Sequence, residues 1–190
     1  MDAIHTEDYN GLTIRIEQDE DPMNPRTDYD NFGHMICFHS RYDLGDKHEM
    51  SKEDLLAMIK RKDVIALPLY LYDHSGITMS TSSFNDRWDS GQVGYIYVTL
   101  EDIRKNFMVK RVTKAIREKA IELMKSEVLT YDDYITNNVY GFVIEDQEGE
   151  TLESCWGFFG DYNGYCLQEA KSSAQGLIEN RLKKQLTTPA

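Results

Sequence analysis

The chain has no long apolar run, and this absence limits where the protein can work. No stretch of its 190 residues approaches the roughly 18–20 apolar residues that cross a bilayer. The first five residues, Met1–His5, lack the basic start and the apolar stretch of a secretory signal peptide. We therefore expect no membrane association, and we expect the protein to stay in the cytoplasm of the cell that makes it.

Cysteine is scarce, and familiar catalytic motifs are absent. The three cysteines, Cys37, Cys155 and Cys166, form no Cys-x-x-Cys pair, and their odd number argues against a disulfide framework. We expect these thiols to be reduced and buried. The chain also has no Gly-x-Ser-x-Gly elbow of a hydrolase and no Gly-x-x-x-x-Gly-Lys loop that would cradle a phosphate.

The chain has few basic residues for its acidic ones: 21 Lys and Arg against 33 Asp and Glu, which gives a net charge of −12. Direct nucleic-acid binding is therefore not expected, since it depends on clustered Lys and Arg. The segment from Glu127 to Glu169 has ten carboxylates and no Lys or Arg, whereas Arg104–Lys125 has eight basic residues. Pairing of this basic segment with the acidic one of a second subunit would give a homo-oligomer.

What the chain does have is the composition of an ordinary globular protein, with 41% hydrophobic and 28% charged residues. A length of 190 residues favours one domain over two. We therefore expect a single domain over residues 1–190, with flexible ends near 1–9 and 187–190.

The pattern of apolar residues predicts an α+β fold. Apolar and polar residues alternate over residues 11–17, as in a half-buried strand. Further strands are expected at 34–39, 64–72, 77–80, 91–99, 140–145 and 151–158. Helices are expected after the capping residues Ser51 and Thr99, and over 113–128 and 167–186, with one or two further helical turns over 131–137. We expect a mainly antiparallel sheet with helices packed on one face and a C-terminal helix.

Four stretches are more distinctive than their composition: Asn24–Asn31, Leu67–Gly76, Trp88–Gly94 and Ser154–Phe158. They read NPRTDYDN, LPLYLYDHSG, WDSGQVG and SCWGF, and together they resemble a family of small uncharacterised proteins of bacteriophages and mobile elements. The similarity runs from about residue 10 to about residue 170. It implies a viral accessory gene expressed in a bacterial host, and it transfers no activity and no catalytic residue. Phage accessory proteins of this size are often inhibitors of host defence, such as restriction or CRISPR systems.

Acidic and histidine residues suggest a metal site as one hypothesis. The candidate ligands are Asp28, Asp30, His34, His39, Asp73 and His74. Mixed His and Asp ligands suit Zn²⁺, Mn²⁺ or Fe²⁺, and oxygen ligands in a loop suit Ca²⁺ or Mg²⁺. A divalent metal is thus the candidate cofactor, and a metal-dependent hydrolase or nuclease is the alternative function. The competing interpretation is that these side chains cap turns and pair with Arg26 or Arg41.

A second set of residues is predicted to bind a partner: Arg26, Asp28, Asp30, Asn31, Trp88, Asp89, Trp156 and Phe158. Exposed aromatic side chains form hot spots for protein partners, although core packing is the alternative for Trp156 and Phe158. Arg26 lies among carboxylates and amides, and this setting predicts an ordered loop. In such a loop the guanidinium serves as a hub for carboxylates and backbone carbonyls.

The leading hypothesis is a binding protein rather than an enzyme. The carboxylate excess predicts an acidic surface that occupies a positively charged site on a host protein, such as a nucleic-acid enzyme. Whether this surface mimics nucleic acid stays open at this point. Together with the resemblance, the carboxylate excess predicts a phage-encoded inhibitor with an anti-restriction or anti-CRISPR role in the host cell cytoplasm.

Overall fold

The computed structural model describes residues 3–187, whose contacts divide the chain into two compact units. The terminal unit combines both ends of the chain, Met1–Met23 and Asn137–Ala190, and the inserted unit is Asn24–Thr136. Whether the whole chain unfolds as one domain stays a prediction. Of the predicted flexible end at 187–190, residues 188–190 lie outside the described part.

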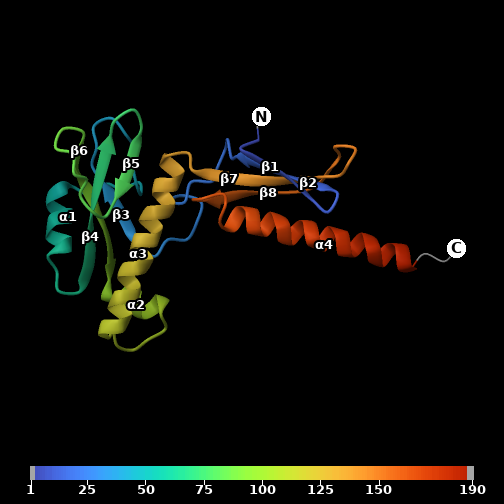
Figure 1. Cartoon of the computed structure of the whole chain (residues 1–190). Helices are drawn as coiled ribbons and strands as arrows, with labels where there is room; N and C mark the ends of the chain where they lie inside the picture. Colours follow the sequence, from blue (N-terminus) through green and yellow to red (C-terminus); the bar gives the residue numbers. More distant parts are fainter. Residues whose placement is uncertain (1–2, 188–190) are drawn as a thin grey trace. The chain divides into compact units, whose positions relative to one another are not determined.

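The terminal unit is a four-stranded antiparallel sheet with one long helix. Its elements are β1 (His5–Tyr9), β2 (Leu12–Gln18), β7 (Val139–Glu145), β8 (Thr151–Phe159) and α4 (Tyr165–Thr187). The strands lie in the order β1-β2-β7-β8. Figure 1 shows α4, in red, along one face of this sheet.

Apolar residues of β2 and β7 that face α4 build the core of the terminal unit. The buried residues are Leu12, Ile14, Ile16, Phe142, Ile144, Cys166, Ala170 and Ala174. The three that α4 contributes recur every four positions, so they share one side of the helix. Two of them are alanines, and such short side chains let the helix lie close to the sheet.

Residues 5–9, which the sequence assigns to a flexible end, form strand β1 instead. The reason is the turn at Asn10 and Gly11, whose φ angles are 54° and 81°. An Asn-Gly pair with two positive φ angles favours a two-residue hairpin. The turn folds β1 onto β2 over five residue pairs, from His5 with Ile16 to Tyr9 with Leu12.

The inserted unit contains a second antiparallel sheet, of order β3-β6-β4-β5. Its elements are β3 (His34–Cys37), α1 (Lys52–Ile59), β4 (Val64–Asp73), β5 (Ile77–Ser80), β6 (Ser90–Thr99), α2 (Leu100–Asn106) and α3 (Lys114–Ile135). β6 and β4 are the two central strands, and their register shifts between Leu69 and Tyr70.

Adjacent residues of the second sheet pack in two different cores. Met35 and Ile96 face α3, where Met124 and other apolar residues cover them. Their neighbours Ile36 and Tyr97 face the opposite side and pack against Leu55 of α1. The period of two along a strand produces this division. Figure 1 accordingly shows α1 and α3 on opposite sides of the sheet.

Capping residues define where the helices of the inserted unit begin. Ser51, Thr99 and Thr113 each adopt an extended conformation and accept a backbone hydrogen bond from the first turn of α1, α2 and α3. The side-chain oxygen satisfies an N–H that has no partner within the helix. The capping sites predicted from the sequence at Ser51 and Thr99 are confirmed.

The predicted fold class is confirmed: the chain is α+β, its sheets are antiparallel, and a helix closes the C-terminal part. The sequence did not predict that the strands divide between two sheets. The expected packing of helices on one face is wrong for the second sheet, because α1 and α3 cover its opposite faces. In the described part of the chain, no helix combines the length and the apolar composition that crossing a membrane requires.

Candidate functional site

The loop Asn24–Gly33 is ordered by hydrogen bonds within itself. The Asn24 side chain accepts from the Arg26 N–H at 2.9 Å, and the Asp28 carboxylate accepts from the Asn24 N–H at 2.8 Å. The N–H groups of Thr27 and Asp28 both donate to the Asn24 carbonyl. Side chains of Asn and Asp favour such turns, and the prediction of an ordered loop is confirmed.

The Arg26 guanidinium is a buried hub. Its Nε donates to Asp46 at 2.7 Å, and its Nη1 donates to Asn31 at 2.8 Å. Its Nη2 donates to the Gly33 carbonyl at 2.7 Å, and Nη1 also lies 3.3 Å from Glu127. Because only 1% of the side chain is exposed, Arg26 acts through the residues that it holds. The hub prediction is confirmed.

The two carboxylates of the hub also fix the entry to β3. The second oxygen of Asp46 accepts from the Met35 N–H at 2.8 Å. Glu127 of α3 accepts from the N–H groups of Phe32 and Gly33 at 2.5 and 3.0 Å. The hub therefore joins a loop, a strand and a helix. Glu127 could not be identified from the sequence, because it lies about 100 residues from the loop and no local pattern marks it.

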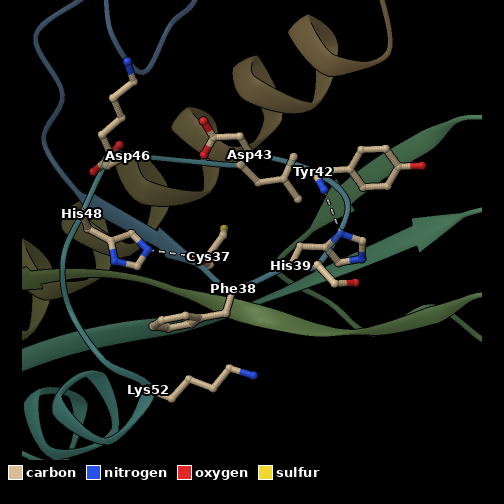
Figure 2. Close-up of a pocket in the computed structure, with 11 residues that line it drawn as sticks. Cys37, Phe38, His39, Tyr42, Asp43, Asp46, His48 and Lys52 are labelled. Atoms are coloured by element: carbon tan, nitrogen blue, oxygen red, sulfur yellow. Dashed lines mark hydrogen bonds between the residues drawn. The ribbon is translucent and has the colours of Figure 1, made fainter.

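Asp46 also lines a cavity of about 440 Å³, around which the segment 37–52 folds (Figure 2). We call it the polar cavity, and it is lined by Cys37, Phe38, His39, Ser40, Tyr42, Asp43, Leu44, Asp46, Lys47, His48 and Lys52. The segment returns to the sheet at Gly45, which pairs with Ile36 and donates its N–H to the Tyr131 hydroxyl at 2.9 Å.

The two histidines of the polar cavity are held in defined tautomers. His39 Nδ1 accepts from the N–H groups of Arg41 and Tyr42, each at 3.3 Å, so a neutral His39 carries its proton on Nε2. His48 Nε2 lies 3.0 Å from the Cys37 carbonyl and must donate to it (Figure 2). Its buried Nδ1 has no hydrogen-bond partner among the described residues. His39 thus keeps a donor available, whereas His48 has a structural role.

Cys37 is not a nucleophile in this setting. Burial first, and then the charge of Asp46, raise the pKa of its thiol to about 12, and Arg26 opposes the shift. The reactive form of cysteine is the thiolate, which this pKa makes negligible near neutral pH. Of the two alternatives for Cys37, a thiolate paired with His39 or a buried thiol, the structure favours the buried thiol.

The three cysteines should therefore differ sharply in reactivity. Cys155 is exposed, so the expectation that all three thiols are buried is wrong for it. Cys37 and Cys166 are buried, and burial raises the pKa of both to about 12. At about pH 8 we expect Ellman's reagent to titrate one thiol rapidly in the native protein and all three after unfolding in guanidinium. Cys155→Ser should remove the rapid phase. A second rapid thiol in the native protein would contradict the burial of the other two.

The first three predicted metal ligands have separate local settings. Asp28 and Asp30 are exposed in the loop, where Asp28 closes the turn at Asn24. The ring centroid of His34 lies 5.2 Å from that of Tyr97. His34 therefore packs against an aromatic residue of the neighbouring strand, rather than against Asp28 or Asp30.

The other three predicted ligands are engaged in pairs. Asp73 forms an ion pair with Arg41 and accepts from the Tyr42 hydroxyl at 3.2 Å. His39 stacks on the same Tyr42 ring, with centroids 5.0 Å apart. His74 pairs with Asp89 at 2.9 Å. Within residues 3–187, no group of three or more His, Cys, Asp or Glu side chains is arranged to hold a metal ion.

Trp88 extends from a well-defined turn. Asp86 accepts from the N–H groups of Trp88 and Asp89 at 2.8 and 2.7 Å. The Asp89 bond first, and then the Trp88 bond, hold the pKa of the Asp86 carboxyl below its ordinary value. The Trp88 side chain is 91% exposed, so this ring is available to a partner.

The two predicted aromatic residues of β8 have different roles. Phe158 packs against Phe142 and Tyr165, with ring centroids 5.7 and 5.6 Å away, and belongs to the core. Trp156 is 42% exposed and lies over Gly141, where a Cβ would come within 2.2 Å of the indole. Trp156 is therefore the aromatic surface residue of β8.

The negative charge is concentrated in the terminal unit. Its sequence has 15 acidic and 5 basic residues, whereas the inserted unit has 18 acidic and 16 basic residues. At one end of the first sheet, the two hairpin turns meet where Gly11 lies against Gln147. Asp8, Glu148 and Glu150 are exposed on these hairpins. This end of the sheet is the acidic hairpin surface.

Comparison with known proteins yields no relative: no family model matches the chain, and neither a curated protein nor a solved structure matches it. The resemblance to bacteriophage proteins therefore stays a prediction from the sequence.

Proposed function

We propose that the protein is a binding protein without catalytic activity of its own, whose terminal unit occupies a positively charged site on a host protein. The observation that carries this proposal is the uneven charge. The terminal unit has a formal charge of −10, against −2 for the larger inserted unit. Solubility alone would not require such a concentration of carboxylates in one unit. A negative field of this kind accelerates encounter with a basic partner.

The arrangement of the charged side chains supports the same proposal. Arg15 of β2 is already paired with Glu17 and Glu145, at 3.1 Å each. The exposed Glu148 and Glu150 form no ion pair among the described residues. A basic partner would therefore find unneutralised carboxylates at the acidic hairpin surface.

The partner that fits best is a nucleic-acid enzyme of the bacterial host. Such enzymes carry clustered Lys and Arg where they bind phosphates, and an acidic surface can mimic that ligand. The resemblance to phage and mobile-element proteins points to inhibition of a defence enzyme, in the host cytoplasm. The protein itself would then not bind nucleic acid.

The test removes charge from the acidic hairpin surface. A partner is first captured from bacterial extract at low salt, identified and purified. It is then titrated with the unmodified protein and with a triple variant, Asp8→Asn, Glu148→Gln, Glu150→Gln. We expect about tenfold weaker binding by the variant, because three ion pairs of roughly 0.5 kcal/mol each are lost. Binding by the unmodified protein should weaken with salt and compete with duplex DNA.

A control variant removes the same charge from the inserted unit, through Glu49→Gln, Glu53→Gln and Glu101→Gln. These carboxylates are also exposed, so the net charge of the two variants is equal. The control should bind as tightly as the unmodified protein. Equal loss in both variants would show that net charge alone matters, and no loss in the first would remove the acidic hairpin surface from the interface.

A further inference from the structure

A second cavity adjoins the polar cavity in the inserted unit. It has a volume of about 200 Å³ and is lined by Phe38, Lys52, Leu55, Leu56, Gln92, Val93, Gly94 and Tyr95. We call it the apolar cavity. Both cavities have Phe38 and Lys52 in their walls. These two side chains therefore form the boundary, with the Lys52 ammonium 5.6 Å from the centre of the Phe38 ring.

Lys52 is the side of the boundary that can move. It is exposed, whereas Phe38 packs against the core around Leu55 and contacts the His48 ring. A long lysine side chain changes rotamer at low cost on a surface. Together, cavities of about 440 and 200 Å³ fall within the range of roughly 300–1,000 Å³ that is typical of small-molecule sites.

The polar cavity presents cationic groups that are not neutralised. Neither Lys47 nor Lys52 forms an ion pair with a carboxylate among the described residues. Asp46, which lies beside them, has both oxygens engaged by the Arg26 guanidinium and a backbone N–H. Asp43 is the opposing charge, and it is exposed. These groups favour an anion over a cation.

The apolar cavity offers a different surface. Leu55 is buried beneath it, and Leu56 is 44% exposed at its edge. Val93 of β6 forms part of its floor. Apolar surface of this kind is covered favourably by an aliphatic or aromatic group.

We propose that the two cavities form one binding site for a small amphipathic anion. Its acidic head lies in the polar cavity beside Lys47 and Lys52, and its apolar body lies against Leu55 and Leu56. Lys52 contributes at the boundary, where its aliphatic stem contacts the body and its ammonium contacts the head. His39 Nε2–H is a further donor of the polar cavity. This site lies wholly in the inserted unit and does not depend on the proposed role of the terminal unit.

A pair of fluorescent probes tests the site. 8-Anilinonaphthalene-1-sulfonate is an aromatic anion, and N-phenyl-1-naphthylamine is its neutral counterpart. We expect the native protein to bind the anion saturably at one site and more tightly than the neutral probe. Lys52→Glu should weaken binding of the anion about tenfold and leave the neutral probe nearly unchanged. Leu56→Asp should weaken binding of both probes, whereas Asp43→Asn should strengthen binding of the anion.

Leu129→Asp is the matched control, because Leu129 is an exposed leucine of α3 that lines neither cavity. It should bind both probes as the unmodified protein does. Competition with octanoate and with octyl phosphate then distinguishes a carboxylate head from a phosphate head, and displacement by either supports the site. The proposal is overturned if neither displaces the probe, if binding does not saturate, or if Lys52→Glu binds the anion as tightly as the unmodified protein.

Discussion

Arg26→Ala is expected to lower the free energy of unfolding by about 3–5 kcal/mol, which is the usual cost of removing one partner from a buried ion pair. The variant leaves Asp46 and Glu127 without their cation, and it leaves the Gly33 carbonyl without its donor. Two-state denaturation in urea measures the loss as a shift in midpoint. In a thermal scan it should appear as a fall of about 10 °C.

Two further variants define what the Arg26 guanidinium contributes. Arg26→Lys should recover only part of the loss, because one ammonium cannot replace a planar fork that serves four partners. Arg41→Ala is the control, since Arg41 forms an ion pair with Asp73 at an exposed position. It should cost at most about 1 kcal/mol. If Arg26→Ala cost no more than Arg41→Ala, the hub would not stabilise the fold.

Local chemistry explains why much of the fold could be predicted from the sequence. Ser51 and Thr99 are followed by apolar residues at helical spacing, and both are N-caps in the structure. Alternation marks β2 to within one residue at each end. The helix predicted over 113–128 has the predicted start, and the helical turns predicted over 131–137 join it as one helix that ends at Ile135, because Tyr131 extends its buried stripe. Such signals act within a few residues and need no tertiary information.

The features that the sequence analysis did not predict depend on pairing between distant segments. β1 is an exception, because the Asn10-Gly11 turn that follows it is a local hairpin signal. The division into two sheets follows from the pairing of β2 with β7, which brings Thr13 beside Glu145 across more than 100 residues. No local pattern specifies that pairing, because the apolar alternation along a strand is the same whichever strand lies beside it.

The candidate site shows the same limit. Arg26 was predicted to be a hub from the amides and carboxylates near it in the sequence, and Asn31 confirms that expectation. The contact of Arg26 with Glu127 could not be predicted from the sequence, because it forms only when α3 packs beside the loop. The proposed convergence of acidic and histidine side chains relied on residue type alone. His74 turns to Asp89 instead, a contact that the pairing of β4 with β6 creates.

Two glycines of β6 provide a sharp test of how closely the strands approach. A Cβ on Gly94 would lie 2.0 Å from the Ile36 carbonyl oxygen and 2.9 Å from the Cys37 Cα. Both are backbone atoms of β3, so no side chain can rotate away. A Cβ on Gly91 would meet nothing within 4 Å. The two positions thus lie on one strand but differ in the space beside them.

Gly94→Ala is therefore expected to lower the free energy of unfolding by about 3 kcal/mol or more, because β3 must move away from β6 to admit the methyl group. Gly91→Ala should leave stability unchanged or raise it by about 0.4–1 kcal/mol, since alanine restricts the unfolded chain. Urea denaturation of both variants measures the difference. Equal stability of the two variants would mean that β3 does not pair with β6 at Gly94. Because Cys37 is the residue that pairs with Gly94, its place in the wall of the polar cavity would then be contradicted as well.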